Sequence, residues 1–152
     1  MKKNKFLVFD MDGTIADLYG IDNWLESLKA EDPTPYIKAQ PFYKPEVLNT
    51  VLKDLKKQNW TIIVTTWLSK GSSKEYDRLV REAKLAWLDK HNFPYDEVHL
   101  VKYGTTKANC TRKHKGFQIL IDDNEKVRKG WNLGATIDAN MDIIDELKKL
   151  IK

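Results

Sequence analysis

The strongest constraint on the fold is a short apolar run that ends abruptly in acidic residues, FLVF at 6–9 followed by DMDGT at 10–14. Four consecutive apolar residues indicate a strand buried on both faces, as in the parallel sheet of an α/β domain. Such a strand carries the carboxylates that follow it to the edge of the sheet where open α/β folds bind ligands. If the extended backbone continues, the side chains of Asp10 and Asp12 point to the same side, and two close carboxylates favour a hard divalent cation such as Mg²⁺ between them. The alternative is a strand that ends in an aspartate-rich turn without any chemistry.

The size and composition of the chain are those of one globular domain. Its 152 residues can bury a substantial core, and 41% hydrophobic with 32% charged residues is typical of a soluble protein. No apolar run is long enough to cross a membrane, and the single cysteine, Cys110, allows no internal disulfide. We therefore expect a cytoplasmic protein without membrane contacts. The net charge of +4 fits an anionic ligand and does not require nucleic acid.

Strand-like and helix-like patterns alternate along the rest of the chain. Runs of apolar and β-branched residues predict strands near 60–66, 97–101, 117–121 and 134–139. Apolar residues at helical spacing predict helices near 45–58, 74–90, 124–131 and 141–151. This alternation predicts an α/β fold with a mostly parallel five-stranded sheet and helices on both faces. We expect the whole chain, 1–152, to form one such domain.

The segment 18–43 interrupts this alternation after the first strand. Asn23 and Glu26 resemble a capping box, which predicts a short helix at 24–30, and Pro33 and Pro35 are expected to end it. The segment is rich in aromatic residues: Tyr19, Trp24, Tyr36, Phe42 and Tyr43. Packing against the core and stacking on a bound ligand are equally compatible with this pattern.

A second pair of acids follows the strand predicted at 117–121, namely Asp122 and Asp123. Burial disfavours the charge on both carboxylates, so such a pair is costly without a counter-ion. The carboxyl ends of parallel strands share one edge of the sheet, which brings the two acid pairs together. The sequence therefore predicts a metal site formed by four residues: Asp10, Asp12, Asp122 and Asp123.

The DMDGT sequence after an apolar strand, with the acid pair at 122–123, resembles the first and last motifs of the haloacid dehalogenase-like phosphatases. The resemblance covers nearly the whole chain, and the two intermediate motifs occur in the expected order. They are Thr65 at the end of the second long strand and a lysine after the third, for which the spacing favours Lys107 over Lys102. The 5′(3′)-deoxyribonucleotidase branch is the most similar, because of the ILIDD ending, the Thr65–Thr66 pair and Lys84 in the helix 74–90. Segment 18–43 then corresponds to the cap insertion of the family, although it is shorter than in that branch.

The resemblance implies a role for each motif residue. Asp10 is the nucleophile that forms an aspartyl-phosphate, and Asp12 protonates the leaving oxygen and then activates water. Mg²⁺ is the implied cofactor, and the resemblance also implies the backbone carbonyl of Asp12 as one of its ligands. Phosphate binding is assigned to four residues: Thr65, Thr66, Lys107 and Lys84. Among these, Lys84 lies off the apolar stripe of its helix and is expected to be an auxiliary contact.

The expected function is Mg²⁺-dependent hydrolysis of phosphomonoesters, with (deoxy)nucleoside monophosphates as the favoured substrates. Trp67, beside the second motif, is a candidate for stacking on the base. An alternative is a phosphatase for the 5′ or 3′ ends of nucleic acids, suggested by the basic loop of Arg112, Lys113, His114 and Lys115. A third possibility is a non-catalytic binding domain with this fold, which is disfavoured because every acid that the chemistry needs is present.

Overall fold

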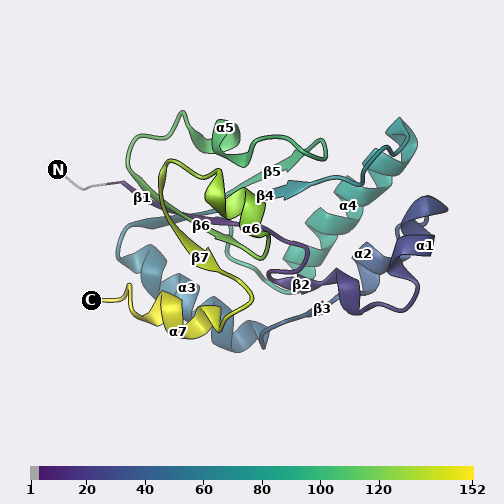
Figure 1. The fold of residues 1–152 in the computed structure, drawn as a ribbon. Helices are drawn as coiled ribbons and strands as arrows, with labels where there is room; N and C mark the ends of the chain where they lie inside the picture. Colours follow the sequence, from purple (N-terminus) through teal and green to yellow (C-terminus); the bar gives the residue numbers. More distant parts are fainter. Residues whose placement is uncertain (1–3) are drawn as a thin grey trace.

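The central element of the fold is β1 (Lys5–Phe9), the middle strand of a five-stranded parallel sheet. The computed structural model describes residues 4–152. The strand order is β5-β4-β1-β6-β7, with β4 at Trp60–Trp67, β5 at Glu97–Val101, β6 at Phe117–Asp122 and β7 at Gly134–Asp138 (Figure 1). Phe9 pairs with Val64 on one side and Ile121 on the other, so the ends of three strands meet beside Asp10. The predicted parallel five-stranded sheet is confirmed.

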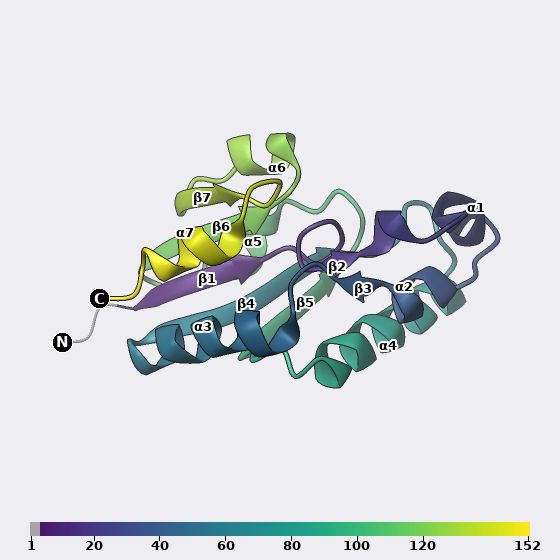
Figure 2. The same ribbon diagram turned by 90° about the horizontal axis from the view of Figure 1, so that it is seen from below.

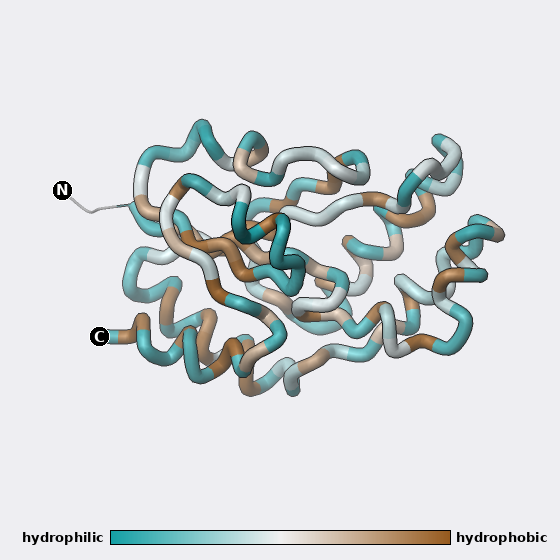
Figure 3. The backbone as a smooth tube through the Cα atoms, viewed as in Figure 1, coloured by the Kyte–Doolittle hydropathy of each residue, from teal (hydrophilic) through white to brown (hydrophobic). Residues whose placement is uncertain are grey.

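Helices cover both faces of this sheet, as predicted. On one face, α3 (Pro45–Lys57), α4 (Lys74–Lys90) and α7 (Ile143–Lys148) pack on the side chains of Leu7 and Phe9. On the other face, α5 (Lys107–Thr111) and α6 (Glu125–Lys129) pack on Val8 and Leu120. Figure 2 looks onto the face of the sheet covered by α3, α4 and α7, and it shows α3 and α7 in front of the strands. The alternation of buried side chains along β1 thus divides the core into two layers, and Figure 3 shows the hydrophobic residues concentrated along the central strands.

The segment 18–43 lies beyond the carboxyl ends of the strands, on the right in Figure 1. It contains a short 3₁₀ turn (Leu18–Gly20), α1 (Trp24–Lys29) and α2 (Thr34–Lys38), and a two-residue pairing of β2 (Ala16–Asp17) with β3 (Gln40–Pro41) closes it at its base. The helix predicted at 24–30 is confirmed as α1. The predicted capping box is wrong, because Asn23 adopts a left-handed conformation with φ of 59° and its side chain makes no capping bond.

The helix α2 is absent from the sequence-based prediction, in which Pro33 and Pro35 only ended a helix. In the structure the two prolines open α2, with Pro35 in its first turn. A proline is tolerated there because its missing N–H would have no partner within the helix. The aromatic ring of Tyr36, on the same helix, is buried against α4.

The basic loop 112–115 lies at the opposite edge of the sheet from Asp10. The strand that follows it, β6, begins at Phe117, which pairs with Lys5 at the start of β1. In this loop the ring of His114 stacks on Phe6 at 4.9 Å and its Nε2 contacts the carboxylate of Glu97 at 3.0 Å. Within residues 4–152, no helix combines the length and the apolar character that crossing a membrane requires.

Candidate active site

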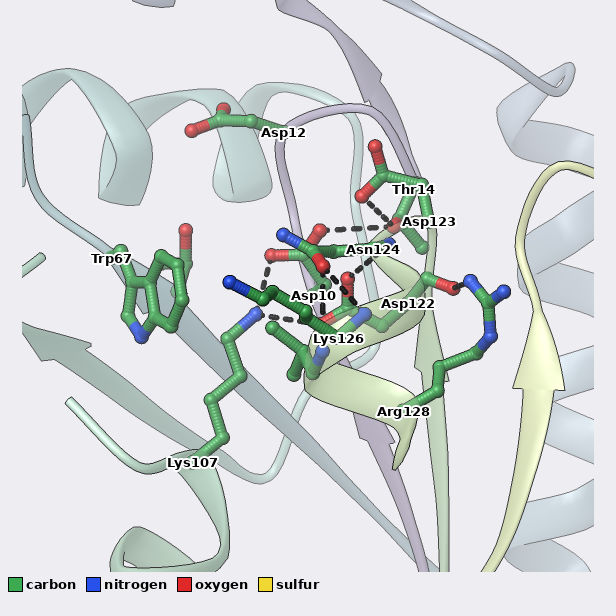
Figure 4. Close-up of polar contacts among 12 residues, drawn as sticks. Asp10, Asp12, Thr14, Trp67, Lys107, Asp122, Asp123, Asn124, Lys126 and Arg128 are labelled. Atoms are coloured by element: carbon green, nitrogen blue, oxygen red, sulfur yellow. Dashed lines mark hydrogen bonds and ion pairs between the residues drawn. The ribbon is translucent and has the colours of Figure 1, made fainter. Parts of the chain in front are cut away.

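Asp10 is positioned by the end of the central strand. Its backbone N–H donates to the carbonyl of Ile121 at 2.9 Å, which continues the pairing of β1 by one residue. The chain then turns sharply, because the carbonyl of Met11 accepts the N–H groups of Thr14, Ile15 and Ala16. Asp12 forms a bridge to Ala16 at the start of this turn, and it lines the same cavity as Asp10. Figure 4 shows the Asp12 carboxylate apart from the group formed by Asp10, Asp122 and Asp123.

The Asp10 carboxylate is held from two sides. Lys107, the first residue of α5, places its Nζ 2.8 Å from Asp10 Oδ1 and 2.8 Å from Asp122 Oδ2, and the Thr14 hydroxyl donates to Asp10 Oδ2 at 3.0 Å. Burial by itself would raise the pKa of Asp10, but the charge and the hydrogen bond of Lys107 outweigh it and lower that pKa. The pKa of Lys107 is in turn raised to about 12, because Asp10 and Asp122 more than offset its own burial. Asp10 is thus an ionised carboxylate next to a charged lysine at neutral pH.

Three of the four expected metal ligands come together. Asp10, Asp122 and Asp123 each offer a carboxylate oxygen, and these oxygens lie within 4.8 Å of one another. Burial and the proximity of Asp10 raise the pKa of Asp122, and burial with a hydrogen bond to Asp10 raises the pKa of Asp123 to about 8. The raised pKa values show that negative charge on these crowded carboxylates is unfavourable without a cation. Carboxylate oxygens are also the ligands that a hard divalent cation prefers. The residues therefore fit Mg²⁺, while the Asp12 carboxylate stays outside this group.

The Asp12 carboxylate binds Lys84 instead. Lys84 Nζ lies 2.8 Å from Asp12 Oδ2, 2.7 Å from Thr66 Oγ1 and 2.8 Å from the Trp67 carbonyl. The lysine is fully buried at 0% exposure, and it lies on the buried face of α4 between Val80 and Leu88, so the expectation that it lies off the apolar stripe is wrong. Burial raises the pKa of Asp12 in spite of the opposing charge of Lys84. A buried ion pair therefore fixes Asp12 at the edge of the site.

The two threonines of the second motif face opposite ways. Thr65 follows Val64, the partner of Phe9, which places it next to Asp10. Its hydroxyl is buried and has no hydrogen-bond partner among the described residues. Thr66, by contrast, accepts from Lys84 on the other side of β4. A buried hydroxyl without a partner is costly, and Thr66, not Thr65, is the threonine that lines the cavity described below.

A cavity of about 300 Å³ opens above Asp10, between the sheet and the segment 18–43. Its floor carries the four aspartates, Thr66 and Lys107, and its walls are mostly apolar and aromatic: Leu18, Tyr19, Trp24, Leu25, Leu28, Tyr36, Trp67, Leu68 and Tyr103. The wall residues Leu25, Leu28 and Tyr103 were missed by the sequence analysis, because no motif or periodicity marks them. The cavity is large enough for a small organic phosphate.

The aromatic residues of the segment 18–43 divide between the two roles left open by the sequence. Tyr19, Trp24 and Tyr36 line the cavity, whereas Phe42 and Tyr43 do not. Tyr43 packs against the core, and its hydroxyl donates to the carbonyl of Met141 at 3.3 Å. Stacking on a ligand thus remains open for the first three residues only.

Trp67 forms part of the cavity wall but is held tightly by its neighbours. Its indole N–H donates to the Thr105 carbonyl at 2.8 Å, and the Nζ of Lys107 lies 5.2 Å from the centre of its ring. The ring of Tyr103 contacts it with centroids 5.0 Å apart. Trp67 therefore presents a fixed aromatic surface beside the lysine that binds Asp10.

Gly13 makes the tight loop possible, and its replacement should damage the site. Its φ is +82°, and a Cβ built on it would collide with Asp123 Oδ2 and lie 2.9 Å from Tyr19. We expect Gly13→Ala to displace the Asp123 carboxylate and to abolish any rise of the melting temperature on adding Mg²⁺. The matched control is Gly104→Ala, with a φ of +87° and no atom within 4 Å of its Cβ. Both variants should lose about 1–2 kcal/mol of stability to the left-handed backbone, and an equal Mg²⁺ response in both would contradict this reading.

Comparison with known proteins gives a likeness in structure and none in sequence. No protein-family model and no curated protein matches the chain. The solved structure of D,D-heptose 1,7-bisphosphate phosphatase from Burkholderia thailandensis is similar over 87% of this chain and 75% of that one, with a TM-score of 0.54 and 13% sequence identity. At that identity the likeness shows a shared fold, and it agrees with the α/β architecture described above.

Proposed function

We propose that the protein is a phosphomonoester hydrolase of the haloacid dehalogenase type, with Asp10 as its nucleophile. The observation that carries this proposal is the buried, ionised Asp10 carboxylate between Lys107 and Thr14, at the end of the central strand and on the floor of a cavity. The likeness in fold to a sugar bisphosphate phosphatase supports the same class of reaction.

The proposed transfer has two steps, in which Asp10 and Asp12 supply the reacting groups. An oxygen of Asp10 attacks phosphorus while the bond to the leaving oxygen breaks, and Asp12 supplies the proton that this oxygen needs. Asp12 then takes a proton from water as the water attacks phosphorus, and the bond to Asp10 breaks to release inorganic phosphate. We propose that Lys107, which lines the cavity, stabilises charge on the phosphoryl oxygens, and that the Thr65 hydroxyl, which has no partner among the described residues, assists it.

A divalent cation completes the electrostatics of this proposal. Lys107 is already shared between the carboxylates of Asp10 and Asp122, so it cannot by itself also neutralise an incoming phosphate dianion. Asp10, Asp122 and Asp123 would hold Mg²⁺. When bound, the cation would neutralise negative charge on the phosphate.

Nucleoside monophosphates are the proposed substrates. The walls above Asp10 expose Tyr19, Trp24 and Trp67, which suit a flat, partly apolar leaving group better than a polyol. We propose that the segment 18–43 acts as a small cap that supplies two of these side chains. The alternative of nucleic-acid ends is less favoured, because the basic loop 112–115 lies at the opposite edge of the sheet and cannot reach a phosphate at Asp10.

The proposal is tested by measuring phosphate release from a panel of compounds. The panel contains nucleoside 5′- and 3′-monophosphates, sugar phosphates and oligonucleotides phosphorylated at either end, each with Mg²⁺. We expect the highest kcat/KM for a nucleoside monophosphate, with a weak dependence on salt because few counterions are released. A higher kcat/KM for an oligonucleotide end, falling steeply with salt, would replace the nucleotidase by the end-processing alternative. Binding of these compounds without any release of phosphate would favour the non-catalytic one.

Trp67 provides a separate test of the substrate class. Replacing Trp67 by alanine should lower kcat/KM for a nucleoside monophosphate by the ~1–3 kcal/mol that a base gains by stacking on an aromatic ring. Glycerol phosphate, which has no base, serves as the control substrate for losses caused by a displaced Lys107. Equal losses of kcat/KM for the two substrates would show that Trp67 positions Lys107 and does not stack on the base.

A further inference from the structure

The environment of Lys84 leaves it no free hydrogen-bond donor. The ammonium group has three N–H bonds, and its Nζ has three oxygen acceptors at 2.7–2.8 Å, on Asp12, Thr66 and Trp67. The side chain is fully buried, and the ring of Tyr36 lies 5.1 Å from the Nζ. A phosphate oxygen would have to displace one of these acceptors to reach the lysine.

We propose that Lys84 is a positioning residue for Asp12 and does not bind the substrate phosphate. This inference rests on the proposed phosphatase function and gives a different role from the auxiliary phosphate contact that the family resemblance implied. The phosphoryl group is contacted instead by Lys107, whose Nζ donates a hydrogen bond to the carboxylate of Asp10. Lys107 thus acts on the nucleophile, Asp10, and Lys84 acts on the general acid, Asp12.

Asp12 needs such support because its backbone does not fix its side chain. It follows the end of β1 and makes a single isolated bridge, to Ala16. Lys84 stands on α4, a 17-residue helix packed on the sheet, and is therefore a rigid anchor. Among the described residues, hydrogen bonds to the Asp12 side chain engage only Oδ2. The second oxygen, Oδ1, is left to exchange a proton with the leaving group or with water.

The contact of Lys84 with Tyr36 extends this arrangement to the cap. Tyr36 belongs to α2, and α2 packs on α4 through a small apolar cluster that includes Leu18 and Val80. Lys84 therefore contacts both the segment 18–43 and the Asp12 carboxylate. Its three acceptors come from the first loop and from β4, so Lys84 joins the parts of the site that surround the leaving group.

The kinetic test uses Lys84→Met, with Lys90→Met, at the exposed end of the same helix, as the matched control. Release of the leaving group is measured in a single turnover for an alkyl phosphate and for 4-nitrophenyl phosphate, whose phenolate departs without a proton. We expect Lys84→Met to lose about 10- to 100-fold for the alkyl ester, part of the general-acid contribution, and much less for the aryl ester. Inhibition by inorganic phosphate should stay within about threefold of wild type, because its binding is not involved. Equal losses for the two esters, or inhibition by phosphate weakened more than tenfold, would overturn the proposal.

A measurement that needs no activity separates this proposal from the function on which it rests. Melting temperatures are compared for wild type, Lys84→Met, Asp12→Asn and the double variant. We expect the double variant to melt above Lys84→Met, because removing the Asp12 charge relieves the carboxylate left unpaired. Additive losses would refute the coupling even if the enzyme proves active, and coupling without turnover of any phosphomonoester would refute only the proposed function. Should Lys84→Met fail to fold, Thr66→Val removes one acceptor of Lys84, and the same preference for loss on the alkyl ester is expected.

Discussion

Replacing Asp10 by asparagine is expected to abolish phosphate release while leaving the fold intact. The amide has nearly the same volume, but it cannot attack phosphorus to form the covalent intermediate. Its oxygen can still accept from Lys107 and its NH₂ group can donate to the Thr14 hydroxyl, so both existing contacts survive. The change also removes one of three crowded carboxylates, which lowers the repulsion among them.

The experiment compares phosphate release and melting temperature for Asp10→Asn and for Asp54→Asn, a surface position on α3. The control should match wild type in both measurements. Asp12→Asn should fall between the two, with the ~10² to 10⁴-fold loss typical of a missing general acid–base group. Turnover by Asp10→Asn close to that of wild type would exclude the covalent mechanism.

Much of the site could be predicted because its residues follow strands. The apolar run that ends at Phe9 marks a buried strand, and the end of such a strand fixes Asp10 whatever surrounds it. The same logic placed Asp122 at the end of β6. The spacing that favoured Lys107 over Lys102 is supported by the geometry, since α5 begins at Lys107 and directs it to Asp10.

The ion pair that Asp12 forms with Lys84 could not be predicted, because it joins residues 72 positions apart in the chain. The turn that follows Asp12 is set by the Met11 carbonyl, which accepts three N–H groups from residues 14–16. The burial of Lys84 could have been predicted, because it lies four residues from both Val80 and Leu88 on the buried face of α4. Helical periodicity does not reveal its partners, which are polar atoms from β4 and from the first loop.

The walls of the cavity are the least predictable part of the site. They come from short helices and loops whose packing is set by tertiary contacts. α2 illustrates this: Pro33 and Pro35 predict the end of a helix, but in the structure they begin a helix that packs against α4. The substrate preference, which depends on these walls, is accordingly the part of the function that needs direct measurement.

Removing divalent metal is expected to abolish phosphate release, and restoring it should stabilise the fold. Asp10, Asp122 and Asp123 repel one another without a cation, so a bound ion favours the folded state by mass action. At a Mg²⁺ concentration 100 times the dissociation constant, this stabilisation is about 2.7 kcal/mol.

The stabilisation by Mg²⁺ should also depend on pH. Burial and Asp10 raise the pKa of Asp123 to about 8, and the ion must displace the proton held below that pH. The Mg²⁺-induced rise in melting temperature should therefore grow as the pH increases toward about 8 and then level off.

The measurement is a series of melting curves with and without millimolar Mg²⁺, alongside phosphate release before and after treatment with a chelator. Asp123→Asn is the informative variant, because it removes one ligand and the proton that competes with the ion. Its Mg²⁺ response should be weaker and should no longer depend on pH in this range. The Asp54→Asn control should respond as wild type does. A melting temperature that ignores Mg²⁺ at every pH, together with activity that survives chelation, would show that the three aspartates hold a shared proton and no metal, and that Lys107 alone neutralises the phosphate.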